Sequence, residues 1–169
     1  MESARAPRER AIGKLAELIN GIKIAMLTTT DNRDGSLVSR PMGTQKVEFD
    51  GQLWFFTEDD SPKVDQVQQD RQVNVSYADN GANRYVSVSG TARIVKDRAK
   101  MEELWNPMFK VWFPEGLDTP DIALLCVDVV RAEYWESDGK IASLLQFAKA
   151  LINREEADDM GTNERLQLK

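Results

Sequence analysis

The chain predicts a single β-dominated α+β domain, in which an antiparallel sheet closes into a barrel and helices lie at its margins. Apolar and polar residues alternate in several short segments such as QVNVSYA (72–78), with the two-residue period of a half-buried strand. Asp-Gly and Asn-Gly pairs, which are typical of tight turns between antiparallel strands, separate these segments. About six or seven such strands favour closure into a barrel.

The length of 169 residues fits one domain with a real core. No linker, internal repeat or low-complexity segment divides the chain. We expect the domain to span residues 1–155, with helices at both ends, and residues 156–169 to form a polar tail.

The first elements are expected to be a helix, two strands and two turns. Residues 8–20 place their apolar side chains on one face, and Gly21 suits the C-cap of that helix. The runs KIAMLTTT and SLVSRPMGTQKVEF are rich in strand-forming residues, and Asp34-Gly35 forms the turn between them. Asp50-Gly51 is expected to form a second tight hairpin, before the strand QLWFFT.

The segment LWFFTEDDSPK (53–63) changes from an apolar strand to the start of a helix that runs to about Asp70. Ser61 can cap this helix through its side-chain oxygen, and Pro62 suits the first helical position. The residues expected on one side of it are Val64, Val67 and Gln68.

Two interpretations of this helix start remain open. It is either a capped surface helix, or an anion site in which Ser61 and Lys63 add a hydroxyl and a charge to the positive end of the helix dipole. The acids at 58–60 oppose the second interpretation unless their side chains point away.

The second half contributes further strands and helices. After the Asn80-Gly81 turn, RYVSVSGTARIV (84–95) alternates again, and Asp97 caps a helix that ends near Asn106. The remaining expectations, in chain order, are an irregular aromatic connection (MFKVWFPEGLDTPD), one or two strands (IALLCVDVVRAEYWES) and an amphipathic helix over residues 140–154.

The composition disfavours several classes of partner. The net charge of −6 and the sequence pI near 4.8 argue against binding a nucleic-acid backbone, although a small anionic cofactor needs only a local cluster of donors. No apolar run approaches the roughly 20 residues that span a bilayer. The charged N-terminus lacks the apolar stretch of a secretory signal. We therefore expect a cytoplasmic protein without a membrane or nucleic-acid partner.

The absence of histidine restricts the chemistry further. It removes histidine acid–base catalysis, Ser-His-Asp and Cys-His sites and histidine metal sites, so no metal is expected. The single cysteine, Cys126, excludes an intrachain disulfide and sits in an apolar run typical of a core. Any redox chemistry must therefore be carried by a bound cofactor.

Five short segments carry a resemblance to a known family. They are SRPM (39–42), WFFT with S-P-K (54–63), YVSVSG (85–90), WNP…WFP (105–114) and AEYW (132–135). In their order and spacing they resemble the general stress protein branch of the pyridoxamine 5′-phosphate oxidase-like flavoproteins. The resemblance implies an FMN-binding split barrel.

The resemblance also implies a phosphate site. In this superfamily a Thr-x-x-x-Ser-x-Lys pattern holds the FMN phosphate, and here it matches Thr57, Ser61 and Lys63. An arginine on the preceding strand matches Arg40, which could pair bidentately with phosphate oxygens; a surface salt bridge is its alternative. The resemblance extends the cofactor-binding set to Pro41, Met42 and Phe56.

Four further residues are candidates for flavin contact by the same resemblance. Tyr85 stands where the oxidases have a flavin-contacting glutamine, and Trp135 matches a tryptophan at the cofactor. Lys110 and Trp112 lie on a segment that approaches the partner subunit's flavin in such dimers. The alternative for Tyr85 is a plain tyrosine on the barrel surface, and ordinary packing is the alternative for Trp135, Lys110 and Trp112.

The sequence departs from the family pattern in two places. Gln45 stands where the first motif ends in lysine, with Lys46 adjacent. The Arg-Leu-His-Asp-Arg element of true pyridoxamine phosphate oxidases is absent, and Ile141-Ala142-Ser143 follows Trp135 instead. We therefore expect the protein not to oxidise vitamin B6 phosphates.

Two functions remain open at this stage. The first is an FMN-dependent oxidoreductase with an unassigned substrate, and the second is a non-catalytic protein that stores or senses flavin. FAD or a deazaflavin could replace FMN. In either case we expect a homodimer with the flavin at the subunit interface, where the aromatic segment 105–114 would pack.

Overall fold

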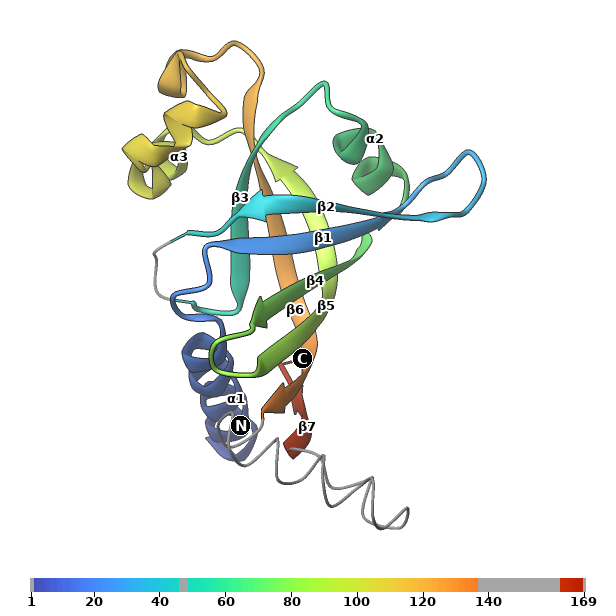
Figure 1. The fold of residues 1–169 in the computed structure, drawn as a ribbon, viewed down its shortest axis with the longest axis vertical. Helices are drawn as coiled ribbons and strands as arrows, with labels where there is room; N and C mark the ends of the chain where they lie inside the picture. Colours follow the sequence, from blue (N-terminus) through green and yellow to red (C-terminus); the bar gives the residue numbers. More distant parts are fainter. Residues whose placement is uncertain (1, 46–48, 137–161, 169) are drawn as a thin grey trace.

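In the computed structural model, residues 2–45, 49–136 and 162–168 are described (Figure 1). They form one antiparallel sheet with helices around it, as the sequence predicts. The elements are α1 (Glu2–Ile19), β1 (Ile24–Thr30), β2 (Leu37–Gly43), β3 (Gln52–Glu58), α2 (Pro62–Gln69), β4 (Gln72–Asp79), β5 (Arg84–Val95), α3 (Arg98–Leu104), the 3-10 helices η1 (Pro107–Val111) and η2 (Gly116–Asp118), β6 (Ile122–Glu136) and β7 (Thr162–Gln167).

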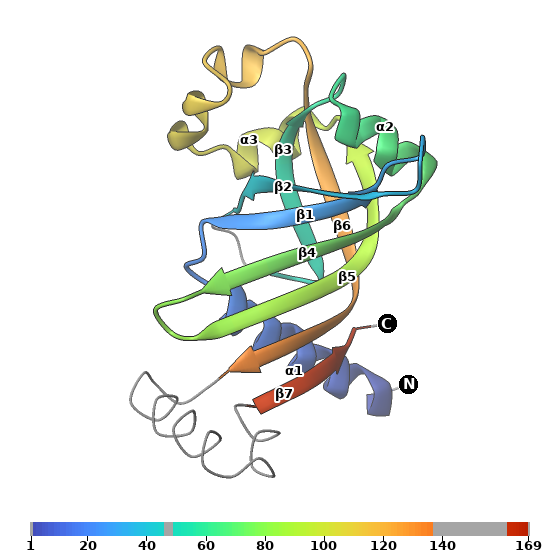
Figure 2. The same cartoon turned by 45° about the vertical axis from the view of Figure 1, so that its right-hand side comes forward.

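The sheet has seven strands in the order β2-β1-β4-β5-β6-β3, with β7 added to β6. The Asp34-Gly35 and Asn80-Gly81 turns join β1 to β2 and β4 to β5, which confirms both hairpins. The strands at the two ends of the order, β2 and β3, also contact each other. They cross in both views, and the sheet thereby curls into a barrel (Figures 1 and 2).

The predicted hairpin at Asp50-Gly51 is wrong. The turn itself exists, because Gly51 has a φ of 111° and the Asp50 carboxylate accepts the N–H of Gln52 at 3.1 Å. However, β3 pairs with β6 along its whole length and not with β2. Four of the seven residues of β3 are buried: Leu53, Phe55, Phe56 and Thr57. Pairing with the buried first half of β6 covers them, whereas β2 is mostly not buried.

The long run 122–136 forms one strand, β6, and not two. Its register with β5 shifts between Ser89 and Gly90, which lets the strand bend while it remains continuous. A side chain at Gly90 would overlap the carbonyl oxygen of Asp128, so glycine is required where the two strands come closest.

The buried hydrophobic residues form two clusters. The larger fills the barrel and includes Leu15 and Leu18 from α1, which confirms the predicted apolar face of that helix. The smaller lies between the ends of β3 and β6 and the α3–η1 segment, and it contains Phe56, Phe109 and Phe113. Asp97 caps α3 as predicted, because its side chain accepts the N–H of Lys100 at 3.1 Å.

The end of the chain differs from the polar tail expected over residues 156–169. Residues 162–167 form β7, which pairs with β6, and Leu168 is buried in the main core. Leu166 is the one apolar residue of this strand, so the alternation that reveals a half-buried strand is absent. Its pairing comes from the backbone, supported by a 2.7 Å hydrogen bond from the Tyr134 hydroxyl to Glu164.

The amphipathic helix predicted over 140–154 lies outside the described residues. Among the described helices, none combines the length and the hydropathy that a membrane crossing requires.

Candidate functional site

The site is built where β3 ends and α2 begins. Thr57 is buried near the end of β3, and its hydroxyl oxygen lies 3.4 Å from that of Ser61. Pro62 has no N–H, and the Val64 N–H donates to the Ser61 carbonyl at 2.9 Å. The N–H of Lys63, at the second helical position, therefore remains for a ligand. Thr57, Ser61 and Lys63 lie together, as the sequence pattern predicts.

Two details of the predicted helix are wrong. Ser61 occupies the N-cap position but makes no side-chain capping bond, because its hydroxyl lies toward Thr57. The buried face of α2 contains Val64, Gln66 and Val67, whereas Gln68 is exposed. A buried glutamine on this face therefore needs a polar partner.

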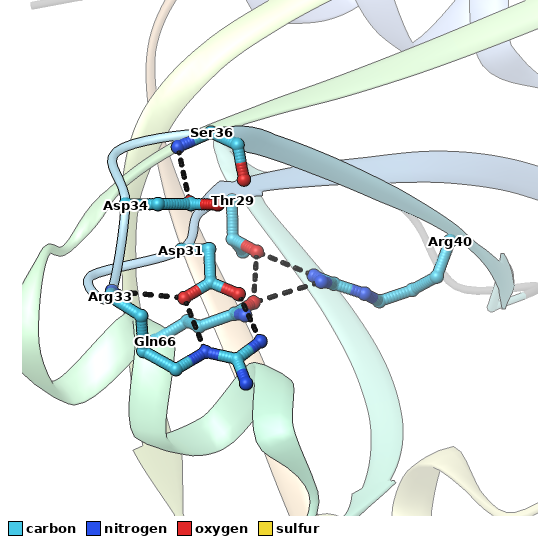
Figure 3. A network of polar contacts seen from close by, with 7 residues as sticks. All are labelled: Thr29, Asp31, Arg33, Asp34, Ser36, Arg40 and Gln66. Atoms are coloured by element: carbon cyan, nitrogen blue, oxygen red, sulfur yellow. Dashed lines mark hydrogen bonds and ion pairs between the residues drawn. The ribbon is translucent and has the colours of Figure 1, made fainter.

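Arg40 on β2 provides that partner (Figure 3). Its Nη1 donates to the Thr29 hydroxyl at 2.6 Å, and its Nη2 donates to Gln66 Oε1 at 2.9 Å. The Thr29 hydroxyl in turn donates to Gln66 Oε1 at 2.6 Å. The three side chains close a ring, and none of them is a carboxylate. The surface salt bridge considered for Arg40 does not occur among the described residues.

The surroundings of the two cations are electrostatically unusual. Burial lowers the pKa of the Arg40 guanidinium. Burial also lowers the pKa of the Lys63 ammonium, with a further contribution from the nearby charge of Arg40. The charges of Glu58 and Asp60 raise the pKa of Lys63, but neither carboxylate forms an ion pair with it among the described residues. A bound anion would relieve this repulsion.

The acids after β3 mostly point elsewhere. Asp59 forms an ion pair with Lys96, and its N–H donates to the Asp121 carbonyl at 2.8 Å. Asp60 is exposed, while Glu58 lies at the rim of the site. The objection that these acids oppose an anion site therefore does not apply to Asp59, whereas the charges of Glu58 and Asp60 still act on Lys63.

Two adjoining depressions open over this region. The first, of about 270 Å³, has an aromatic wall formed by Phe56, Phe109, Trp112 and Phe113. The second, of about 490 Å³, has charged and polar side chains among its apolar lining, namely Arg40, Gln66 and the Asp31–Arg33 ion pair, and is called the polar depression. They share Pro41, Met42 and Lys63. One ligand with an apolar ring system and a phosphate could therefore occupy both.

The predicted residues divide into two groups. Those that line the depressions are Arg40, Pro41, Met42, Phe56, Thr57, Lys63 and Trp112, with Ser61 in contact through Thr57. Tyr85 and Trp135 are cross-strand neighbours on β5 and β6, and neither lines either depression. Lys110 is exposed on η1 beside the aromatic wall.

Some residues of the site have no signal in the sequence analysis. Gln66 and Thr29 read as ordinary polar positions on a helix and a strand, and only the fold shows that both are buried against Arg40. Phe109 and Phe113 read as part of the aromatic connection. Gly43 is a further residue of the site without a signal in the sequence, because a Cβ atom on it would lie only 3.3 Å from Cε1 of the Phe109 ring.

No group of three or more possible metal ligands occurs among residues 2–45, 49–136 and 162–168. Cys126 lies in the core, where burial raises the pKa of its thiol to about 11. It therefore stays protonated and unreactive at neutral pH.

This combination of fold and site defines a class: an antiparallel split barrel with two half-buried cations beside an aromatic wall. The chain belongs to the family described as pyridoxamine 5′-phosphate oxidase like, whose model matches residues 10–158. The resemblance deduced from the sequence is thereby confirmed.

Individual relatives agree with this assignment. The chain is 33% identical to Protein bli-3 of Neurospora crassa over 153 residues, which cover 83% of this chain and 73% of that protein. A Clostridium acetobutylicum protein related to general stress protein 26 has the same fold, with a TM-score of 0.70, 20% identity and coverage of 95% and 96% of the two chains. A general stress FMN/FAD binding protein from Xanthomonas citri is 28% identical, with a TM-score of 0.66 and coverage of 78% and 92%.

Proposed function

We propose that the protein is a general-stress-type flavoprotein that binds FMN and transfers electrons through it. The observation that carries the proposal is the pair of cations, Arg40 and Lys63, at the junction of an aromatic and a polar depression, without a carboxylate partner among the described residues. The 28% identical Xanthomonas citri protein, named for FMN/FAD binding, supports the choice of a flavin.

The residues present fit FMN in charge and in shape. Its phosphate carries about −1.5 to −2 charges, and Arg40, Lys63, Thr57 and Ser61 offer charged and hydroxyl donors to it. Its ring system is apolar and flat, which suits the wall formed by Phe56, Phe109 and Trp112.

The residues of the chain would bind and orient the cofactor. The flavin, when bound, supplies the hydride and electron transfer. Arg40 and Lys63 fix the phosphate end, and the aromatic wall excludes water from one side of the ring. Glu58 and Lys63 are the titratable residues described in the lining of the aromatic depression, so a proton needed there would come from one of them or from water.

The scarcity of acid–base groups favours one alternative, a protein that stores or senses flavin without turnover. Apart from Lys63, Glu58 is the only titratable residue described in the lining of the aromatic depression, and the whole chain has no histidine. The alternative shares the phosphate site with the oxidoreductase and differs from it only in whether the bound flavin turns over.

We also propose that the protein works as a homodimer. Three exposed apolar side chains lie beside the aromatic depression: Met108 and Val111 on η1, and Trp112 directly after it. Val111 is 80% exposed. Apolar side chains in such a group usually mark an interface. A second copy seated here would cover the open side of the depression.

The test begins with the ligand. Mass spectrometry of the small molecules released from purified protein should detect FMN. Calorimetric titration should then give tighter binding for FMN than for riboflavin, which lacks the phosphate. Equal binding of both would overturn the phosphate site. Oxidation of NAD(P)H by the FMN-loaded protein supports the oxidoreductase, whereas bound but inert FMN supports the storage protein.

A further inference from the structure

Gln66 is a buried polar residue that belongs to the polar depression, yet neither the family pattern nor the proposed flavin site gives it a role. It is 8% exposed and lies on the buried face of α2, a helix that packs on β1 and β5. Its Oε1 accepts from Arg40 Nη2 at 2.9 Å and from the Thr29 hydroxyl at 2.6 Å. Because Arg40 can only donate, the oxygen of the amide is the atom that points to it.

The ring formed by Thr29, Gln66 and Arg40 orients the guanidinium from one side. Two of its five N–H groups are used, by Thr29 and by Gln66. The other three N–H groups form no hydrogen bond with the described residues. An arginine whose fork is already oriented loses less conformational entropy when it binds an anion.

The chemical nature of the acceptor matters as much as its position. A carboxylate at position 66 would form the same two hydrogen bonds, but it would neutralise the guanidinium and compete with any anionic ligand. The amide and the hydroxyl are neutral, so they orient Arg40 and leave its charge available. Lys63, which lines the same depression, likewise has no ion pair among the described residues.

We propose that Gln66 is a positioning residue that selects phosphorylated ligands by orienting Arg40 with a neutral acceptor. The inference rests on the proposed function, because it takes the phosphate of FMN as the ligand of Arg40. It adds that the preference for FMN over riboflavin is determined by the neutrality of residue 66 as well as by the two cations.

The test uses the ratio of the dissociation constants of riboflavin and FMN, measured by quenching of flavin fluorescence. Gln66→Glu preserves the shape of the side chain and adds a charge beside Arg40. Gln66→Met preserves the volume and removes the acceptor. Gln68→Glu is the matched control, since it makes the same charge change at an exposed position of the same helix.

The expected result is a loss of phosphate discrimination without a loss of ring binding. In Gln66→Glu the ratio should fall about tenfold or more, since a charge-assisted contact is neutralised. In Gln66→Met it should fall about threefold, because Arg40 keeps its charge but loses its orientation. Gln68→Glu should keep the ratio of the unmodified protein. If Gln66 had a purely structural role, its replacement would instead weaken the binding of riboflavin and of FMN by the same factor.

The outcomes separate this inference from the proposed function. If the unmodified protein binds FMN no better than riboflavin, the phosphate site itself is overturned. If it prefers FMN and Gln66→Glu keeps that preference, the role of Gln66 is overturned while the site stands. If circular dichroism shows that Gln66→Glu does not fold, Gln66→Met decides, and an unchanged ratio in that variant overturns the role.

Discussion

Arg33 holds both carboxylate oxygens of Asp31, with Nε 3.0 Å from Oδ1 and Nη2 2.6 Å from Oδ2 (Figure 3). The Arg33 hydrogen bonds lower the pKa of Asp31 to about 2, so this carboxylate is charged at every physiological pH. Asp31 lines the same depression as Arg40 and Lys63. Arg33 therefore prevents the one acid described in the lining of this depression from neutralising the two cations.

Replacing Arg33 by alanine should weaken FMN binding severalfold. The freed Asp31 carboxylate stays charged and becomes available to Arg40 or Lys63, in competition with the phosphate. Calorimetric titration measures the change, with Arg131→Ala, an exposed arginine on β6, as the control. The double variant Asp31→Asn/Arg33→Ala should recover most of the affinity. A double variant as weak as the single one would show that Arg33 contacts the ligand itself.

Lys63→Ala and Arg40→Ala should each weaken FMN binding about tenfold or more, because charge-assisted contacts are worth roughly 1.5–3 kcal/mol. Riboflavin binding should change little in either variant. Thermal unfolding of the ligand-free Lys63→Ala protein should show no loss of stability, since burial lowers the pKa of Lys63 and the charged form is disfavoured there. A lower unfolding midpoint would assign Lys63 to the structure and not to a site.

The affinity for FMN should change with pH as Lys63 loses its proton. The protonated ammonium attracts the phosphate, so affinity is complete near neutral pH and declines as the pH rises through the pKa of Lys63 in the free protein. That pKa is lowered from its ordinary value of 10.5, and the decline therefore begins at a lower pH than an exposed lysine would cause. The ratio of riboflavin to FMN dissociation constants cancels ionisation of the ring. In the Lys63→Met variant the same ratio should not change with pH. If the ratio still declines in that variant as the pH rises, the titration belongs to another group.

The protein should not oxidise pyridoxine or pyridoxamine 5′-phosphate. The Arg-Leu-His-Asp-Arg element of the oxidases is missing, and the chain has no histidine to replace it. Incubation of the FMN-loaded protein with each substrate should yield no pyridoxal phosphate above the free-flavin control. Turnover on the order of 1 s⁻¹ or faster would contradict this expectation.

The sequence predicts those parts of this molecule that depend on local pattern. The alternation in 72–78 and 84–95 and the hairpins at Asp34-Gly35 and Asn80-Gly81 depend on neighbours close in the chain, and they form as expected. Pairing between distant segments is different. That β3 joins β6, and that β7 adds a strand from a polar segment, depends on which strand edge remains open when the barrel closes.

The candidate site shows the same division. Thr57, Ser61 and Lys63 are near one another in sequence, and their grouping follows from the helix start. Gln66 belongs to the site because α2 packs on β1, which brings it to Thr29 and within reach of the Arg40 side chain. No periodicity distinguishes this glutamine from the exposed Gln68 two residues later.

The last prediction concerns the proposed homodimer. Light scattering of the FMN-loaded protein should give a mass near twice the 19.1 kDa of one chain. Val111→Glu tests the surface: Val111 is 80% exposed on η1 and lines neither depression, so the substitution leaves the site of one chain intact. If a second copy covers the open side of the aromatic depression, a charge here should produce a monomer with weaker FMN binding, because desolvating it at an apolar interface is costly. Gln68→Glu, with the same added charge on α2, should remain dimeric. A Val111→Glu monomer that binds FMN as tightly as the unmodified protein would show that one chain makes the whole site.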